Sequence, residues 1–267
     1  MSASQPDDSG SILVGQPAEG VRLLTINRPH KLNALSARLV PELERALDEA
    51  ERDGATRVVI LTGAGSKAFI AGADIAEYQG GRSEAFIAYQ LTSRRVYDGL
   101  EALSKPTIAA VNGYALGGGF EVALCCDVII CSSNAKFGLP EGKLGLVPGG
   151  GGTQRLTRIV GRQAAAELLL SASFMQGQRA YELGVASACV TPEQLMPAAL
   201  ALAANMMQVA PRAQAEAKRL LREGAEAPLP AALSLEQEVL FRLFASADGQ
   251  EGVDAFLNKR PPKFNGQ

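Results

Sequence analysis

The stretch from Pro106 to Arg155 constrains the fold more than any other part of the chain. An apolar run, Thr107 to Val111, has the composition of a buried β-strand and leads into an Asn-Gly turn. Three consecutive glycines, Gly117 to Gly119, then precede a short apolar segment of helical character. Glycine permits sharp turns and close approach of another backbone, so this order predicts a tight strand-to-helix junction.

Two carboxylates lie near this junction. Glu121 stands inside the apolar segment, and Glu141 follows Pro140 with glycines on both sides. Burial disfavours the charged form of a glutamate, so its pKa rises toward the range useful for proton transfer. The alternative is structural for each residue alone. Glu121 would then be a salt-bridged or helix-capping acid, and Glu141 a loop carboxylate.

The glycines predict a site for a developing negative charge. The first N–H groups of a helix have no internal partner, and the helix dipole favours an anion there. A carbonyl oxygen that gains charge can therefore be stabilised at Gly117 to Gly119, as in an oxyanion hole. A second corner of small residues, Ala71 to Ala73, offers another N–H and is followed by Asp74, a candidate helix N-cap. The alternative is that the glycines serve only close helix–strand packing.

Composition excludes several functional classes. The net charge of −2 gives no basic surface for nucleic acid, and no apolar run approaches the roughly 18 residues that span a bilayer. A single histidine, His30, lies in a polar turn, so a Ser-His-Asp triad or a His-rich metal site is not expected. Acid–base chemistry then falls to carboxylates, Lys, Tyr or Cys. The four cysteines are expected to be free thiols in a reducing cytoplasm.

The order of the periodic patterns predicts an α/β core followed by helices. Strand and helix patterns alternate up to about Val190, and only helical patterns follow. We expect a disordered tail at 1–10, a core that carries the site at 11–195, and a helical region at 196–267. The expected strands are Val21–Asn27, Arg57–Thr62, Thr107–Val111, Val128–Cys131 and Ala186–Val190, and the first two long helices are Ser36–Arg52 and Ser83–Leu103.

The glycines that follow the second expected strand superficially match a dinucleotide-binding turn. Gly63 and Gly65 have the spacing of that motif, which requires a helix to begin at once. Here Phe69 and Ile70 precede a further glycine instead. The sequence therefore argues against a nucleotide cofactor at this position.

Taken together, these segments resemble the enoyl-CoA hydratase/isomerase family, the crotonases. The resemblance runs from about Val21 to the end of the chain. It is carried by the segments AFIAGADI (68–75), AAVNGYALGGGFEVALCCD (109–127), FGLPEGKLGLVPGGGGTQRL (137–156), AYELGV (180–185) and AFLNKRPPKF (255–264). The two glycine-rich segments are specific in combination, and the spacing from Glu121 to Glu141 is similar to the family's spacing.

The resemblance implies a crotonase-like spiral of strand-strand-helix units, with a C-terminal helical region that packs in trimers or dimers of trimers. It implies an acyl-CoA thioester substrate whose carbonyl oxygen accepts N–H bonds from Ala73 and Gly118. Glu121 and Glu141 stand at the two hydratase positions, which favours reversible hydration of a trans-2-enoyl-CoA. No metal and no redox cofactor is implied.

Binding of the CoA part is less sharply defined. Ala76 stands where many relatives carry a lysine that helps to hold CoA. We expect Arg28, Lys31 and Lys259 to compensate, because CoA phosphates need local cations. Further substrate contacts are expected from the second small-residue corner and its continuation, namely Ala71, Asp74 and Ile75.

Two other functions remain open from the sequence. Another crotonase reaction, such as Δ3-Δ2 isomerisation of an enoyl-CoA, would use the same oxyanion hole. A hydratase-like RNA-binding protein would need a basic helix face. The helix expected at Ser36–Arg52 has more acidic than basic residues, with Arg38, Arg45 and Arg52 against Glu42, Glu44, Asp48, Glu49 and Glu51.

Overall fold

The computed structural model describes residues 11–80 and 83–267. Its main feature is a six-stranded sheet in the order β1-β2-β3-β5-β7-β10. These strands are β1 Ser11–Ala18, β2 Val21–Asn27, β3 Val58–Gly63, β5 Thr107–Val111, β7 Val128–Ser132 and β10 Ala188–Val190. All neighbours pair in parallel except β1, which forms an antiparallel edge with β2.

A second, smaller sheet has the order β4-β6-β8-β9. Its strands are β4 Ala68–Ile70, β6 Tyr114–Leu116, β8 Lys136–Gly138 and β9 Met175–Gln176. The chain visits the large sheet and then the small one before each of its central helices, for example β5, β6 and then α3, Gly118–Cys125. This repeated strand-strand-helix order is the spiral that the resemblance implied.

Both faces of the large sheet are buried, as the continuous apolar character of its strands predicts. Val59 and Leu61 face the larger core cluster, which includes the small sheet and residues of α1 (Leu39–Arg52), α2 (Ser83–Ala102) and α3. The alternate residues Val58 and Ile60 face a second cluster with α6, Leu195–Met206. The large sheet is thus packed between α6 on one face and the small sheet with α1, α2 and α3 on the other.

The remaining helices follow the sequence signals closely. Ser36 Oγ accepts a hydrogen bond from Leu39 N at 3.1 Å, so it caps the first turn of α1 as expected. Pro41 falls in that first turn, where its missing N–H costs nothing. Gly161 adopts φ 77° and ψ 164°, which breaks α4 (Gly152–Ser171) into two helical parts. Helix α5 spans Gly177–Glu182.

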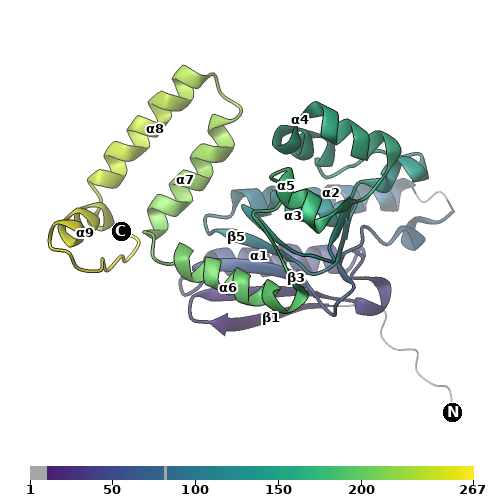
Figure 1. Ribbon diagram of the computed structural model, residues 1–267, viewed down its shortest axis with the longest axis horizontal. Coiled ribbons are helices and arrows are strands. Elements are labelled where there is room, and N and C mark those ends of the chain that lie inside the picture. The colour runs from purple at the N-terminus through teal and green to yellow at the C-terminus, as the bar shows by residue number, and fades with distance from the viewer. Residues whose placement is uncertain (1–10, 81–82) are drawn as a thin grey trace, which may run out of the picture.

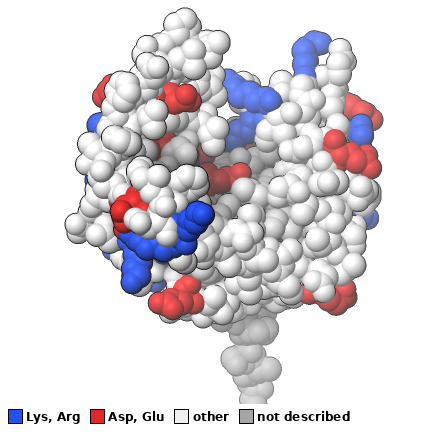
Figure 2. Space-filling view, turned by 60° about the vertical axis from the view of Figure 1, so that its left-hand side comes forward, with Lys and Arg blue, Asp and Glu red and all other residues white. Residues whose placement is uncertain are grey.

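The C-terminal helices extend away from the sheets (Figure 1). They are α7 Pro211–Gly224, α8 Leu229–Phe244 and α9 Ala247–Leu257. Within α8 only Val239 is buried, while Leu240, Phe241 and Phe244 are at least 60% exposed. Where these helices come forward, charged side chains form small separate groups and much of the surface is uncharged (Figure 2).

Helix α6 differs from the helices that follow it, because Ala199 and Ala203 are fully buried against the large sheet. The helices after α6 therefore lack this packing against the large sheet. The domain boundary that we expected at 195/196 stays a prediction. None of the helices within residues 11–80 and 83–267 is long and apolar enough to cross a membrane.

Candidate active site

The predicted strand-to-helix junction is present and depends on its glycines. Strand β6 ends at Leu116, Gly117 adopts φ 51°, and α3 begins at Gly118. A Cβ on Gly119 would clash with the Ile70 carbonyl group of β4, so only glycine lets α3 lie this close to the small sheet. The junction thereby brings the first turn of α3 against β4 and the corner that follows it.

Glu121 is held in one orientation by the loop before α4. The residue is 2% exposed, and its Oε1 accepts hydrogen bonds from Gly150 N at 2.7 Å and Gly152 N at 2.8 Å. Burial raises the pKa of Glu121, while these two N–H groups and the charge of Arg155 act in the opposite direction. Because Oε1 has two donors, Oε2 is the oxygen left for a substrate or water.

Glu141 faces the same space from the other side. It lies in a 3-10 helix, Pro140–Leu144, and a Cβ on Gly117 would lie 3.0 Å from its Oε1. Its Oε2 is buried and accepts no hydrogen bond from the described residues. Burial, together with the nearby charge of Glu121, raises the pKa of Glu141 to about 7. A group with that pKa can donate or accept a proton near neutral pH.

Two backbone N–H groups meet the carboxylates at one cavity of about 120 Å³. Ala73 forms a parallel bridge with Leu35 in which Asp74 N, not Ala73 N, donates to Leu35 O. Gly118 is the first residue of α3. Neither Ala73 N nor Gly118 N has an acceptor in the described part of the chain. Both residues line the cavity with Glu121 and Glu141, so the arrangement suits an oxygen that gains negative charge.

The expected CoA contacts are only partly brought together. Ala71 and Ile75 line the cavity, and Ile75 is 43% exposed. Arg28 is 4% exposed, and its Nη1 lies 2.7 Å from Asp74 Oδ2. These two residues thus hold each other and tie the corner before Ile75 to the end of β2. Direct contact of Arg28 or Asp74 with CoA stays a prediction.

The two lysines lie in different places. Lys31 is exposed in a short 3-10 helix directly after β2. Lys259 follows α9 in a left-handed conformation, with φ 52°, and is not among the residues that line the cavity. Lys31 does not line the cavity either, so a phosphate contact by Lys31 or by Lys259 stays a prediction.

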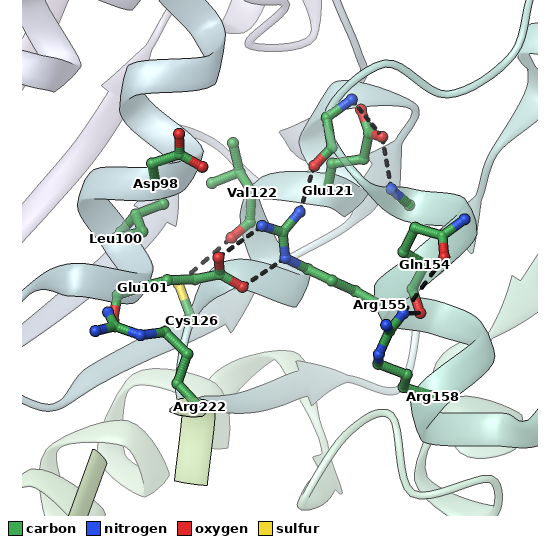
Figure 3. Close-up of polar contacts among 12 residues, drawn as sticks. Asp98, Leu100, Glu101, Glu121, Val122, Cys126, Gln154, Arg155, Arg158 and Arg222 are labelled. Atoms are coloured by element: carbon green, nitrogen blue, oxygen red, sulfur yellow. Dashed lines mark hydrogen bonds and ion pairs between the residues drawn. The ribbon is translucent and has the colours of Figure 1, made fainter. Parts of the chain in front are cut away.

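Sequence reasoning missed an ion pair behind Glu121. Arg155 Nε donates to Glu101 Oε1 at 2.6 Å, and its Nη1 donates to the Gly150 carbonyl at 2.5 Å (Figure 3). Gly150 in turn donates its N–H to Glu121. Arg222 of α7 also donates to the Glu101 carbonyl at 2.9 Å. Arg155 stands directly after the glycines in the sequence, within the segment TQR, which could have drawn attention to it. Nothing in the sequence indicated that Glu101 would be the partner of Arg155.

No group of three or more potential metal ligands occurs among residues 11–80 and 83–267. The four cysteines are free, and Cys125, Cys126 and Cys131 are buried. Burial raises the pKa of the Cys125 thiol well above its usual value. These cysteines therefore behave as small apolar side chains and supply no nucleophile to the cavity.

Comparison with known proteins shows the family to which the chain belongs. Residues 16–267 match the family described as Enoyl-CoA hydratase/isomerase, and the chain belongs to this family. The short-chain-enoyl-CoA hydratase of Clostridium acetobutylicum is 41% identical over 240 residues, which cover 90% of this chain and 92% of that protein. The crotonyl-CoA hydratase of Syntrophomonas wolfei is 39% identical over 252 residues, covering 94% and 97%.

Solved structures share the whole fold. The enoyl-CoA hydratase from Bacillus anthracis superposes with a TM-score of 0.93 at 36% identity, covering 96% of this chain and all of that one. An enoyl-CoA hydratase subunit from Geobacillus kaustophilus gives 0.90 at 40% identity, covering 98% and 100%. The crotonase-like α/β spiral with its C-terminal helices is thereby confirmed.

Proposed function

We propose that this chain catalyses the reversible syn addition of water to a trans-2-enoyl-CoA, giving a 3-hydroxyacyl-CoA. The observation that carries the proposal is the convergence of the buried Glu121 and the half-buried Glu141 on the cavity where Ala73 N and Gly118 N are without acceptors. The names of the relatives support the same reaction class, since those quoted above are hydratases of short enoyl-CoA thioesters.

The N–H groups would act on the thioester. A carbonyl oxygen bound by Ala73 N and Gly118 N gains charge as water attacks C3, because the electrons of the double bond move toward the carbonyl. Donors fixed by β-bridge and helix geometry need no reorganisation when that charge develops. They stabilise the enolate-like state more than the ground state, which is the condition for acceleration.

The carboxylates would move one proton each. Glu121 Oε2 takes a proton from water as the oxygen bonds to C3, and Glu141 delivers a proton to C2. The pair begins with its proton on Glu141 and ends with it on Glu121, so the charge of the site is unchanged over the reaction. The reverse reaction uses the same two tautomers in the opposite order. Every step uses groups of this chain, and none requires a metal or redox cofactor.

Assembly and location belong to the same proposal. The apolar side chains that α8 exposes, such as Phe241 at 66% and Phe244 at 60%, are more than an isolated helical tail normally presents to water. We propose that they are covered in a trimer or a dimer of trimers. The free, buried thiols support a reducing cytoplasm.

The test is loss of the conjugated enoyl-thioester absorbance with crotonyl-CoA. Glu121→Gln and Glu141→Gln should each lower kcat about 100-fold or more, the scale of a positioned acid or base. The double variant should be much less than multiplicatively worse, because the pair acts as a unit. Glu19→Gln, an exposed change in the β1–β2 turn, is the matched control and should keep full activity.

Labelled water separates hydration from isomerisation. A hydratase places heavy oxygen from water at C3 of the product, whereas an isomerase shifts the double bond of a 3-enoyl-CoA without taking up oxygen. Absence of label, together with intact activity in Glu121→Gln, would refute the hydratase proposal and leave the isomerase one.

A further inference from the structure

Tyr97 places a phenol at the centre of the cavity. It lies on α2, is 3% exposed and lines the cavity with Gly118 and Glu121. A Cβ on Gly118 would lie 3.1 Å from Tyr97 Oη. A Cβ on Gly150 would lie 2.5 Å from Tyr97 Cζ and 2.7 Å from Glu121 Oε2. The phenol and the unoccupied oxygen of Glu121 therefore face each other across a single glycine.

The hydroxyl group of Tyr97 has no hydrogen-bond acceptor in the described part of the chain. The hydroxyl group opens onto the cavity, where an oxygen atom of a substrate or a water molecule can accept its hydrogen bond. Burial and the charge of Glu121 raise the pKa of Tyr97, so the phenol remains neutral and keeps its proton.

We propose that Tyr97 is a third catalytic residue, whose O–H donates a hydrogen bond to the oxygen atom that adds at C3. The inference rests on the proposed hydration reaction. Glu121 Oε1 is occupied by two N–H groups, so Oε2 must take the proton of the attacking water. Tyr97 lies on that side of the carboxylate, across Gly150, and holds the water oxygen while its proton leaves.

Proton balance in this step is simple. Water gives one proton to Glu121 Oε2, its oxygen forms the bond to C3, and Tyr97 retains its own proton throughout. In the reverse reaction the same hydrogen bond stabilises the departing hydroxyl group. Tyr97 therefore contributes orientation and charge stabilisation and is not a proton carrier.

The first experiment is Tyr97→Phe, measured after wild-type hydration of crotonyl-CoA has been established. We expect kcat about tenfold lower with KM unchanged, because the hydroxyl contacts the reacting oxygen and not the CoA thioester. The melting temperature should not fall, since the hydroxyl has no partner in the protein. Tyr181→Phe, which alters a half-exposed tyrosine on α5, is the control. Unchanged kcat in Tyr97→Phe would overturn the proposal, whereas an inactive wild type would instead overturn the proposed function.

The second experiment measures binding where turnover is slow, in Glu141→Gln with and without Tyr97→Phe. Loss of the phenol should weaken binding of 3-hydroxybutanoyl-CoA about fivefold and leave saturated butanoyl-CoA unaffected, because only the former carries the oxygen at C3. The ratio of the two affinities is independent of the folded fraction. Equal changes for both ligands, or no change for either, would show that Tyr97 only shapes the pocket and would refute its contact with the reacting oxygen.

Discussion

The raised pKa of Glu141 predicts a specific pH dependence of hydration. Glu141 must be protonated to deliver a proton to C2, and burial raises its pKa to about 7. Raising the pH therefore removes the active form, and at pH 9 only about 1% of Glu141 would carry a proton. Half of Glu141 carries a proton at pH 7, so we expect kcat/KM for crotonyl-CoA to fall roughly 50-fold between pH 7 and pH 9.

The acidic limb is set by Glu121. Its pKa is also raised by burial, so protonation begins to remove the base at a pH above the ordinary glutamate range. The profile should be bell-shaped, because the active pair carries one proton. Hydration and dehydration should have the same bell-shaped pH profile, since both start from tautomers of the singly protonated pair of Glu121 and Glu141.

The assay is initial-rate hydration from pH 5 to pH 9 in buffers of constant ionic strength. Added viscogen is the control, because a step limited by diffusion would flatten the profile without any change in pKa. A kcat/KM that stays constant from pH 6 to pH 9, with no viscosity effect, would refute the assignment of Glu141 as the acid.

Three further outcomes follow from the same geometry. Arg155→Met should lower kcat about tenfold and move the acidic limb of the pH–rate profile to higher pH, since Arg155 lowers the pKa of Glu121 and holds Gly150. Arg158→Met on the same helix is the control. Identical pH–rate profiles for Arg155→Met and Arg158→Met would contradict this role of Arg155. Lys31→Ala should raise KM for acyl-CoA with little change in kcat, as uniform binding requires, and a fall in kcat alone would exclude the phosphate contact. Glu141→Gln should raise the melting temperature relative to wild type at pH 8.5 more than at pH 5. A glutamate with a raised folded-state pKa stabilises the fold below its unfolded pKa of 4.5 and loses that contribution as the pH rises through about 7; melting curves at both pH values measure the difference.

The parts of the fold with strong local signals were predictable from the sequence. Strand β2 has the predicted bounds, Val21–Asn27, and α1 and α2 end within a residue of expectation. Three-residue strands such as β4 and β6 carry no periodicity that a window can detect, so their pairing was available only through the family resemblance. Strand β1 was missed because Ser11–Ala18 mixes polar and apolar residues and its outer positions are exposed.

The parts of the candidate site that lie close together in the sequence were predictable. Gly118 and Glu121 lie close together in sequence, and a glutamate in an apolar helix is conspicuous. Tyr97 and Arg155 were not singled out, because a tyrosine on an amphipathic helix resembles core packing and an arginine near a helix start resembles a surface charge. Both are placed by residues distant in the sequence, since Arg155 pairs with Glu101, 54 residues earlier, and Tyr97 lines the cavity with Glu121, 24 residues later.

The exposed apolar surface of α8 has a consequence for how stability is distributed along the chain. The two core clusters lie before α7 and hold the sheets together, whereas Val239 is the single buried residue of α8. In an isolated protomer, backbone amides of α8 would open by local fraying and exchange with deuterium long before those of β3 or β5. Exchange in α8 should then slow with rising protein concentration if other protomers cover it, while exchange in β3 stays constant. The C-terminal helices would thus report the association of the protomers, and the strands would report global unfolding.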